Sequence, residues 1–158
     1  SSAQWRASFE SMFVGLVRLA DLVLPGMIER KFGRIIMVIS SGVIEPIPNL
    51  AISNAIRPAL VGWGKSLANE VARHNITVNA LAPGRIATDR LAQLDTANAE
   101  KQGKSVEEVA AAAKARIPAS RYGTVDEYAA AAVFLASQAA SFMTGSILRV
   151  DGGQIASH

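Results

Sequence analysis

Apolar residues recur along the chain with two different spacings, and each spacing predicts a different kind of element. In residues 8–29 and 51–74 they fall three or four positions apart, which is typical of helices with one apolar face. The runs Arg34–Ile39 and Ile76–Leu81 are short, continuous and rich in β-branched residues, which favours strands buried on both faces of a sheet. The order helix, strand, helix, strand predicts an α/β fold with a parallel sheet.

The second half of the chain continues this alternation. Residues 91–116 are rich in alanine and predict two helices separated by a glycine-containing break. The sequences SVEE at 105–108 and TVDE at 124–127 have the spacing of helix capping boxes, and the latter opens a predicted helix over 125–136. Ser146–Val150 predicts a third strand, so we expect three parallel strands with helices on both faces.

A sheet of three parallel strands leaves an unpaired edge. If Arg34–Ile39 is the first strand, one of its edges has no partner within the chain, and an exposed edge invites pairing with other strands. We therefore expect either a partner chain or a further N-terminal half of the protein to cover it. The first residue, Ser1, is not methionine and lies next to a helical pattern, which favours the second interpretation.

Composition narrows the class of protein. Half of the 158 residues are hydrophobic and 18% are charged, which indicates one globular domain rather than a disordered chain. The net charge of +3 is spread along the chain, so nucleic acid is not an expected partner. Without cysteine there is no disulfide, thiolate nucleophile or cysteine-bound zinc, and no metal site is expected. The apolar stretches are interrupted before the roughly 18 residues of a membrane span, so we expect a cytoplasmic protein that does not bind membranes.

Four stretches carry a resemblance to a known family: GRIIMVISS at 33–41, ITVNALAPGRIATD at 76–89, FLAS at 134–137 and TGSILRVDGG at 144–153. In this order and spacing they resemble the C-terminal half of a short-chain dehydrogenase/reductase. The detail GVIEPIPNLAISNAIR at 42–57 is similar to an atypical branch of that family, related to β-ketoacyl-acyl-carrier-protein reductases.

The resemblance implies a Rossmann-like doubly wound parallel sheet that binds NAD or NADP. Residues 1–158 then form a single partial Rossmann domain, the C-terminal portion. The glycine-rich phosphate loop of the family, of the form TGxxxGxG, does not occur in this sequence. The resemblance also implies hydride transfer between the cofactor and a small carbonyl compound or secondary alcohol.

Most of the family's catalytic positions are changed here. By resemblance, Ser41 is the serine that holds the substrate oxygen, with Ser40 as an alternative. Ser53 stands where the family has its proton-donating tyrosine, Arg57 where it has lysine, and Met12 where it has asparagine.

These changes bear directly on proton transfer. A phenol has a pKa of about 10, which a nearby cation can lower, whereas an aliphatic hydroxyl is a much weaker acid. An arginine side chain keeps its proton, so it can stabilise charge but not act as the acid. The sequence thus leaves two interpretations: an oxidoreductase with a degenerate catalytic tetrad, or a catalytically inactive module for binding and oligomerisation.

A second group of candidates follows the strand Ile76–Leu81. By resemblance Pro83, Gly84, Ile86 and Thr88 lie against the nicotinamide, where Ile86 and Thr88 bond its carboxamide, and Arg57 contributes to cofactor binding. The alternative is a plain turn from strand to helix, which also calls for proline and glycine.

Other segments have two interpretations each. Residues 91–116 match the family's helical substrate lid, but they are equally typical of a simple helical hairpin. Residues 8–29 and 51–74 match the helices that form a four-helix interface in the family, so a homodimer or homotetramer is expected, although both apolar faces suit a core as well. Tyr122 and Glu45 are possible replacement acids, but packing suits Tyr122 better and a solvated loop suits Glu45.

Overall fold

The computed structural model describes residues 1–157 and confirms the predicted parallel sheet. Its three strands are β1 (Gly33–Val38), β2 (Ile76–Pro83) and β3 (Ile147–Val150), and β2 lies in the centre, paired in parallel with both neighbours. Each strand starts or ends within two residues of its predicted boundary. The fold class expected from the sequence, three parallel strands of a Rossmann-like sheet, is therefore confirmed.

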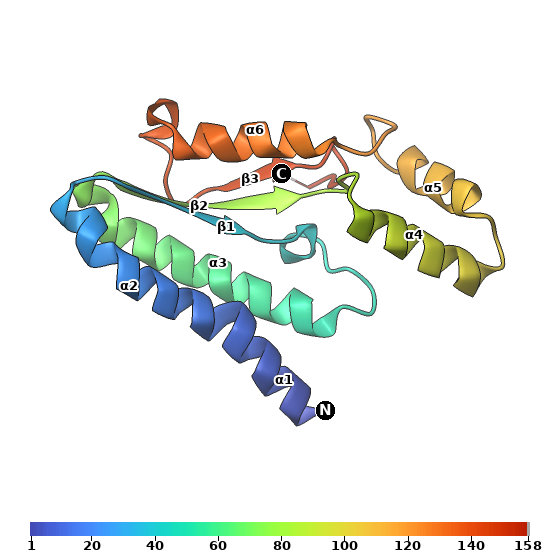
Figure 1. Cartoon of the computed structure of the whole chain (residues 1–158), viewed down its shortest axis with the longest axis horizontal. Coiled ribbons are helices and arrows are strands. Elements are labelled where there is room, and N and C mark those ends of the chain that lie inside the picture. The colour runs from blue at the N-terminus through green and yellow to red at the C-terminus, as the bar shows by residue number, and fades with distance from the viewer. Residues whose placement is uncertain (158) are drawn as a thin grey trace.

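Helices cover both faces of the sheet, as the sequence predicted. In Figure 1, α2 and α3 lie below the sheet and α6 lies above it, while α4 and α5 form a hairpin beyond the end to which β2 points. The helices and helical turns in order are α1 (Ser2–Phe9), the π-helical turn η1 (Glu10–Val14), α2 (Gly15–Glu29), η2 (Ser41–Val43), α3 (Ala51–Val71), η3 (Ala72–His74), α4 (Asp89–Gln102), α5 (Val106–Ala115), α6 (Val125–Ala136) and η4 (Gln138–Ala140).

The core is built on the central strand, whose side chains alternate between the two faces. Ile76, Val78 and Ala80 pack in the cluster that faces α2 and α3, and each is at most 1% exposed. Leu81 belongs to the cluster on the α6 side, together with Leu135. Because both faces of β2 are covered, the strand is largely apolar, as expected in a parallel sheet, and its buried Asn79 side chain is hydrogen-bonded to Met143 O and Ser146 N.

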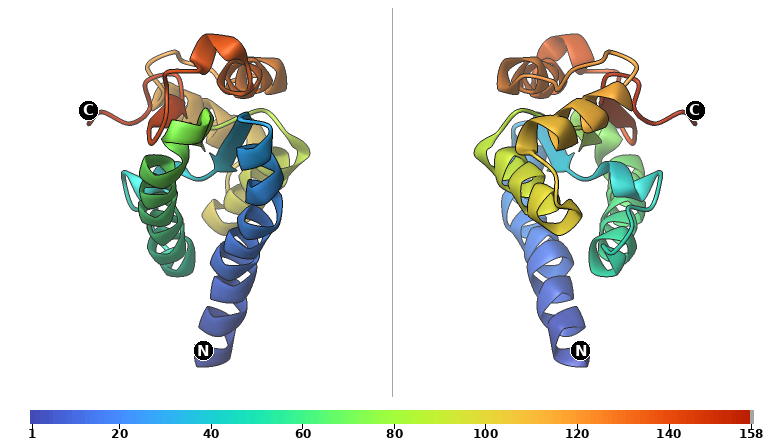
Figure 2. Two further views of the ribbon diagram at one scale, coloured as in Figure 1. Left: turned by 90° about the vertical axis from the view of Figure 1, so that its left-hand side faces the viewer. Right: turned by 90° about the vertical axis from the view of Figure 1, so that its right-hand side faces the viewer.

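The N-terminal helix is longer than the sequence pattern predicted. It runs without a break from Ser2 to Glu29, with the π-helical turn η1 inside it, and its N-terminal end extends beyond the rest of the molecule in Figure 2. By length and composition alone, this helix is apolar enough to cross a membrane, with a mean hydropathy of 1.6 in its most apolar window, of which 6% is buried. Charged residues such as Arg18 and Asp21 do interrupt this helix, as expected, so it contains no unbroken apolar run of about 18 residues. A core or interface helix of a soluble protein passes the same test, so the finding is weak evidence for a membrane.

The outer edge of β1 is exposed in the part of the chain that the structure describes. β1 pairs only with β2, and Val38 at its end is 57% exposed. This confirms the expected open edge, which is a site at which a further strand could pair.

The two-faced core leads to a stability prediction. Replacing Leu60 of α3, 1% exposed, by alanine removes buried apolar contacts and is expected to lower the free energy of unfolding by about 2–5 kcal/mol. Urea denaturation measures this change. The matched control is Leu94→Ala, at a site that is 41% exposed, where the loss should be less than half as large. Equal losses for the two variants would contradict the assigned core.

Candidate functional site

Two of the three predicted catalytic residues meet at the start of α3. Arg57 Nε donates a hydrogen bond to Ser53 Oγ over 3.2 Å, because residues four apart lie on the same face of a helix. Arg57 Nη1 donates to the carbonyl oxygen of Val38 over 3.2 Å, at the exposed carboxyl end of β1. The guanidinium has five N–H groups, so others remain to bind a ligand.

Ser41, the third predicted catalytic residue, opens the helical turn that follows β1. Its carbonyl oxygen accepts from the backbone N–H groups of Ile44 and Glu45, both over 3.0 Å, and its hydroxyl has no hydrogen-bond partner within residues 1–157. The alternative, Ser40, is engaged locally, because its hydroxyl accepts from Gly42 N over 3.1 Å. Of the two hydroxyls, that of Ser41 is the unengaged one, whereas that of Ser40 accepts one bond and keeps its proton to donate. Within residues 1–157 no hydrogen bond joins Ser41 to Ser53 or Arg57.

Asn54 fixes the loop between these residues, a role that the sequence analysis missed. Its side chain donates to the carbonyl oxygen of Ile47 over 2.8 Å and accepts from Ile47 N over 3.3 Å. A Cβ added to Gly42 would lie 2.7 Å from Asn54 Oδ1, so only glycine fits there without a shift. An asparagine beside a proline-rich loop is a signal for such a side-chain clamp, but the sequence does not show which residue it holds.

Met12, at the position where the family has asparagine, lies in the π-helical turn η1, and this turn contacts α3. Its thioether sulfur is only a weak acceptor and donates no hydrogen bond, so it cannot replace an amide in a chain of hydrogen bonds. π-helical turns inside α-helices are frequent at functional sites.

The loop after β2 presents main-chain groups rather than side chains. Ile86 forms a parallel bridge with Gly123, in which Gly123 N donates to Arg85 O over 2.9 Å and Ala87 N donates to Gly123 O over 2.8 Å. In this arrangement the N–H and C=O of Ile86 itself point away from Gly123, and neither has a partner within residues 1–157. One donor and one acceptor are thus available at this loop.

The other candidates in this loop, Pro83, Gly84 and Thr88, have structural roles. Pro83 is the last residue of β2 and pairs with Val150. A Cβ added to Gly84 would lie 2.6 Å from the Cα of Asp151, so the close approach of these two backbones requires glycine. Thr88 is the N-cap of α4 and accepts from Leu91 N over 3.4 Å, which leaves its hydroxyl proton free to donate. Their contacts with a cofactor remain predictions.

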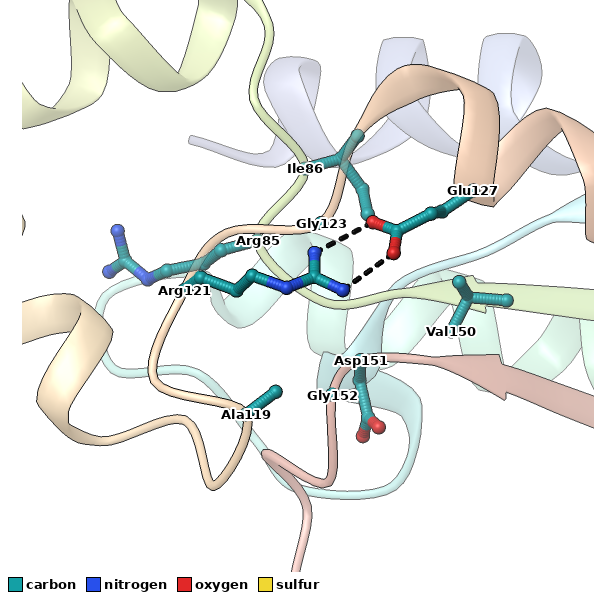
Figure 3. A pocket seen from close by; sticks show the side chains of 9 residues that line it. All are labelled: Arg85, Ile86, Ala119, Arg121, Gly123, Glu127, Val150, Asp151 and Gly152. Atoms are coloured by element: carbon teal, nitrogen blue, oxygen red, sulfur yellow. Dashed lines mark hydrogen bonds and ion pairs between the residues drawn. The ribbon is translucent and has the colours of Figure 1, made fainter.

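Two hollows lie next to this loop. The smaller, about 140 Å³, is bounded by the pair that Arg121 and Glu127 form, and Figure 3 shows the Arg85 side chain directed away from that pair. The larger, about 310 Å³, lies beneath the α4–α5 hairpin, and Gln154 Oε1, which lines it, is buried without a partner in the described residues. Ser41, Ser53 and Arg57 line neither of these hollows, and each of the three is half-buried.

Asp95 joins three separate segments and is 3% exposed. Its carboxylate pairs with Arg85 Nη1 over 3.2 Å and accepts from the Tyr122 hydroxyl over 2.7 Å. Burial, followed by the hydrogen bond to Asp95, raises the pKa of Tyr122, so the phenol stays protonated and donates. The expectation that Tyr122 has a packing role is consistent with this position, but the sequence pattern did not predict its buried partner.

At the start of α6, Arg121 and Glu127 form a bidentate ion pair, with distances of 2.6 and 2.8 Å. The hydrogen bonds from Arg121, and then that from the backbone of Thr124, lower the pKa of Glu127 to about 2. Glu127 and Thr124 also form the predicted capping box. The same prediction is confirmed at Ser105 for α5.

The sheet, with its loops gathered at the carboxyl ends of parallel strands, defines part of a Rossmann-like domain. A family model described as enoyl-(acyl carrier protein) reductase matches residues 1–154. Among curated proteins, the NADPH-dependent reductase BacG of Bacillus subtilis is 38% identical over 151 residues, which is 96% of this chain and 58% of BacG. The 3-oxoacyl-[acyl-carrier-protein] reductase FabG of Salmonella typhimurium is 37% identical over 152 residues, 95% of this chain and 57% of FabG.

Solved structures agree with these matches. YwfH, an NADPH-dependent reductase involved in bacilysin biosynthesis, has a TM-score of 0.94 at 33% identity and is matched by 100% of this chain over 61% of its own length. L-sorbose reductase from Gluconobacter frateurii has a TM-score of 0.92 at 30% identity, with 100% and 60% covered. The chain belongs to the short-chain dehydrogenase/reductase family. It spans under three fifths of the length of the curated relatives BacG and FabG.

The Arg121–Glu127 pair leads to a prediction about acid stability. The folded pKa of Glu127, about 2, lies below the ordinary value of 4.5, so its contribution to stability is fully present above about pH 4.5 and is lost as the pH falls toward 2. Glu127→Gln should therefore lower Tm near neutral pH, and this difference from the wild type should shrink as the pH falls below 4.5. Thermal denaturation at several pH values measures it, with Asp126→Asn as the control. A difference that stays constant with pH would contradict the assignment.

Proposed function

We propose that the whole protein is an NAD- or NADP-dependent oxidoreductase that acts on a carbonyl compound or a secondary alcohol. The relatives support this proposal, since BacG and YwfH are both described as NADPH-dependent reductases. The observation that carries it is the cluster of Ser53, Arg57 and Val38 at the carboxyl end of β1, where doubly wound sheets bind their ligands.

The residues present fit the nicotinamide end of such a cofactor. The N–H and C=O of Ile86, which have no partner within residues 1–157, complement the donor and acceptor of a carboxamide. The Thr88 hydroxyl has a proton to donate, and Arg57 has N–H groups for a ribose hydroxyl. When bound, the dinucleotide would supply or accept the hydride.

In the proposed mechanism, the side chains of this chain hold and polarise the substrate oxygen. The Ser41 hydroxyl, which has no partner within residues 1–157, donates to that oxygen. Ser53 accepts from Arg57 Nε and so has its own proton to donate, while the positive charge of Arg57 stabilises negative charge that develops on the oxygen. Water supplies the proton, because neither side chain is a suitable acid. Loss of a positioned acid costs on the order of 10²–10⁴ in rate, so turnover should be slow.

A second proposal is a module that binds and assembles without catalysis. It is favoured by Ser53 and Arg57 at the tyrosine and lysine positions and by the exposed apolar side chains of the N-terminal helix. Those side chains are Trp5, Phe9, Leu16, Leu19, Leu22 and Val23. A homodimer or homotetramer formed through this helix and α3 would cover such a face under either proposal.

Three further assignments belong to the first proposal. The hairpin α4–α5, within residues 91–116, is the lid over the substrate, residues 1–158 are one partial Rossmann domain, and the protein acts in the cytoplasm. The hairpin's place beyond the end of β2 supports the assignment as a lid. The lack of cysteine fits a reducing compartment such as the cytoplasm.

Restoring the family's residues tests the catalytic proposal. In the full-length protein, Ser53→Tyr combined with Arg57→Lys should raise NADPH-dependent reduction of a ketone panel by on the order of 10²-fold, because a phenol beside a lysine supplies the missing acid. The control, Ser66→Tyr, introduces the same side chain at an exposed site on α3 and should leave the rate unchanged. Unchanged rates in the double variant, with NADPH still bound, would favour the non-catalytic module.

A further inference from the structure

The α4–α5 hairpin is attached to the rest of the chain at few points. α4 and α5 pack mainly against each other, with little contact to the sheet or α3. Its buried apolar residues are Leu91, Ala99 and Val109, at 8%, 3% and 8% exposed. Asp95 is the buried carboxylate of α4, and its side chain bonds to two segments outside the hairpin. Low contact density of this kind is typical of segments that open locally.

The partners of Asp95 lie on segments that are themselves fixed. Arg85 is held in the loop after β2 by the hydrogen bond from Gly123 N to its carbonyl oxygen. The segment that leads to Tyr122 is tied to the end of β3, since Ala119 N donates to Gly152 O over 3.1 Å. Asp95 therefore connects a loosely packed hairpin to two anchored loops.

Tyr122 contacts both helices of the hairpin. Its hydroxyl donates to Asp95 of α4, and Lys114 of α5 places its ammonium 5.1 Å from the centre of the Tyr122 ring. A cation over an aromatic face is attractive, although modestly so at an exposed site. The position of α5 thus depends on the same tyrosine that holds α4.

Arg85 also connects its ion pair with Asp95 to the two hollows. Arg85 lines both of them, and the larger one extends from it to Gln154 beneath the hairpin. If the hairpin lifts, this hollow opens and the buried carboxylate meets water. The shape of the larger hollow therefore depends on the position of the hairpin. That position depends on Asp95, because loss of a partner would leave its buried carboxylate uncompensated.

We infer that Asp95 is a positioning residue that, through Arg85 and Tyr122, holds the α4–α5 hairpin over the larger hollow and so sets the space available to a substrate. The part about substrate rests on the proposed function, whereas the part about the hairpin does not. Asp95 lies outside the Ser41, Ser53 and Arg57 group and acts on the ligand only through the hairpin.

Hydrogen–deuterium exchange of the full-length protein tests the position of the hairpin. In Asp95→Asn, peptides from residues 91–115 should exchange at least tenfold faster, while peptides from α3 keep the wild-type rate. The control Glu100→Gln makes the same chemical change at an exposed site on α4 and should alter neither. Wild-type rates in the hairpin of Asp95→Asn, or faster exchange in both regions, would overturn the inference.

A combined variant separates pairing from the mere presence of Asp95. Arg85→Met should speed exchange in the hairpin, because it leaves the buried Asp95 carboxylate without its cation, whereas Arg85→Met, Tyr122→Phe and Asp95→Leu together should return it to within about threefold of the wild type, because no buried charge or hydroxyl loses its partner. Additive effects of the three changes would contradict a pairing role.

Steady-state kinetics test the consequence for substrate. In the restored Ser53→Tyr, Arg57→Lys background, adding Asp95→Asn should raise KM for a ketone at least fivefold and change kcat less than twofold. An unchanged KM would overturn the substrate part. Absence of turnover in the background itself would count against the proposed function, and the exchange experiment would then decide the role of the hairpin alone.

Discussion

The burial of β2 on both faces is the constraint on which the rest of the structure depends. A largely apolar parallel strand must be covered on each side, and here α2 and α3 cover one face while α6 covers the other. This arrangement brings the carboxyl ends of β1 and β2 to the same edge of the sheet. The loops that follow, with Ser41 after one strand and Ile86 after the other, are thereby placed where ligands bind in doubly wound sheets.

At that edge the chain retains the means to bind and polarise a ligand, but not the usual means to protonate it. The Arg57–Ser53 pair provides a fixed positive charge and a hydroxyl, and the Ile86 backbone provides a donor and an acceptor. An aliphatic hydroxyl cannot take over the acidity of a phenol, whatever cation lies beside it. Under the proposed function, the geometry fits binding and electrostatic activation better than efficient acid catalysis, and slow turnover is expected.

How far the sequence predicted the structure depended on the range of the interactions. The capping boxes at Ser105 and Thr124 were predictable because each involves residues three apart. The strands were predictable because buried parallel strands are continuously apolar. The π-helical turn at Glu10–Val14 has no sequence signature of that kind, and the burial of Asp95 depends on partners 10 and 27 residues away. Of the candidate site, the sequence predicted Ser41, Ser53 and Arg57, and the structure pairs the last two, whereas the role of Asn54 required the folded loop.

The central proposal is that this site, in which Ser53 and Arg57 are predicted to stand at the family's tyrosine and lysine positions, binds a nicotinamide dinucleotide. Isothermal titration calorimetry of the full-length wild-type protein with NADPH and NADH tests it most directly. The account predicts saturable binding of at least one of them, at one site per chain, with a Kd below about 1 mM, the upper end of typical substrate levels. No binding of either nucleotide by a folded protein would contradict the account.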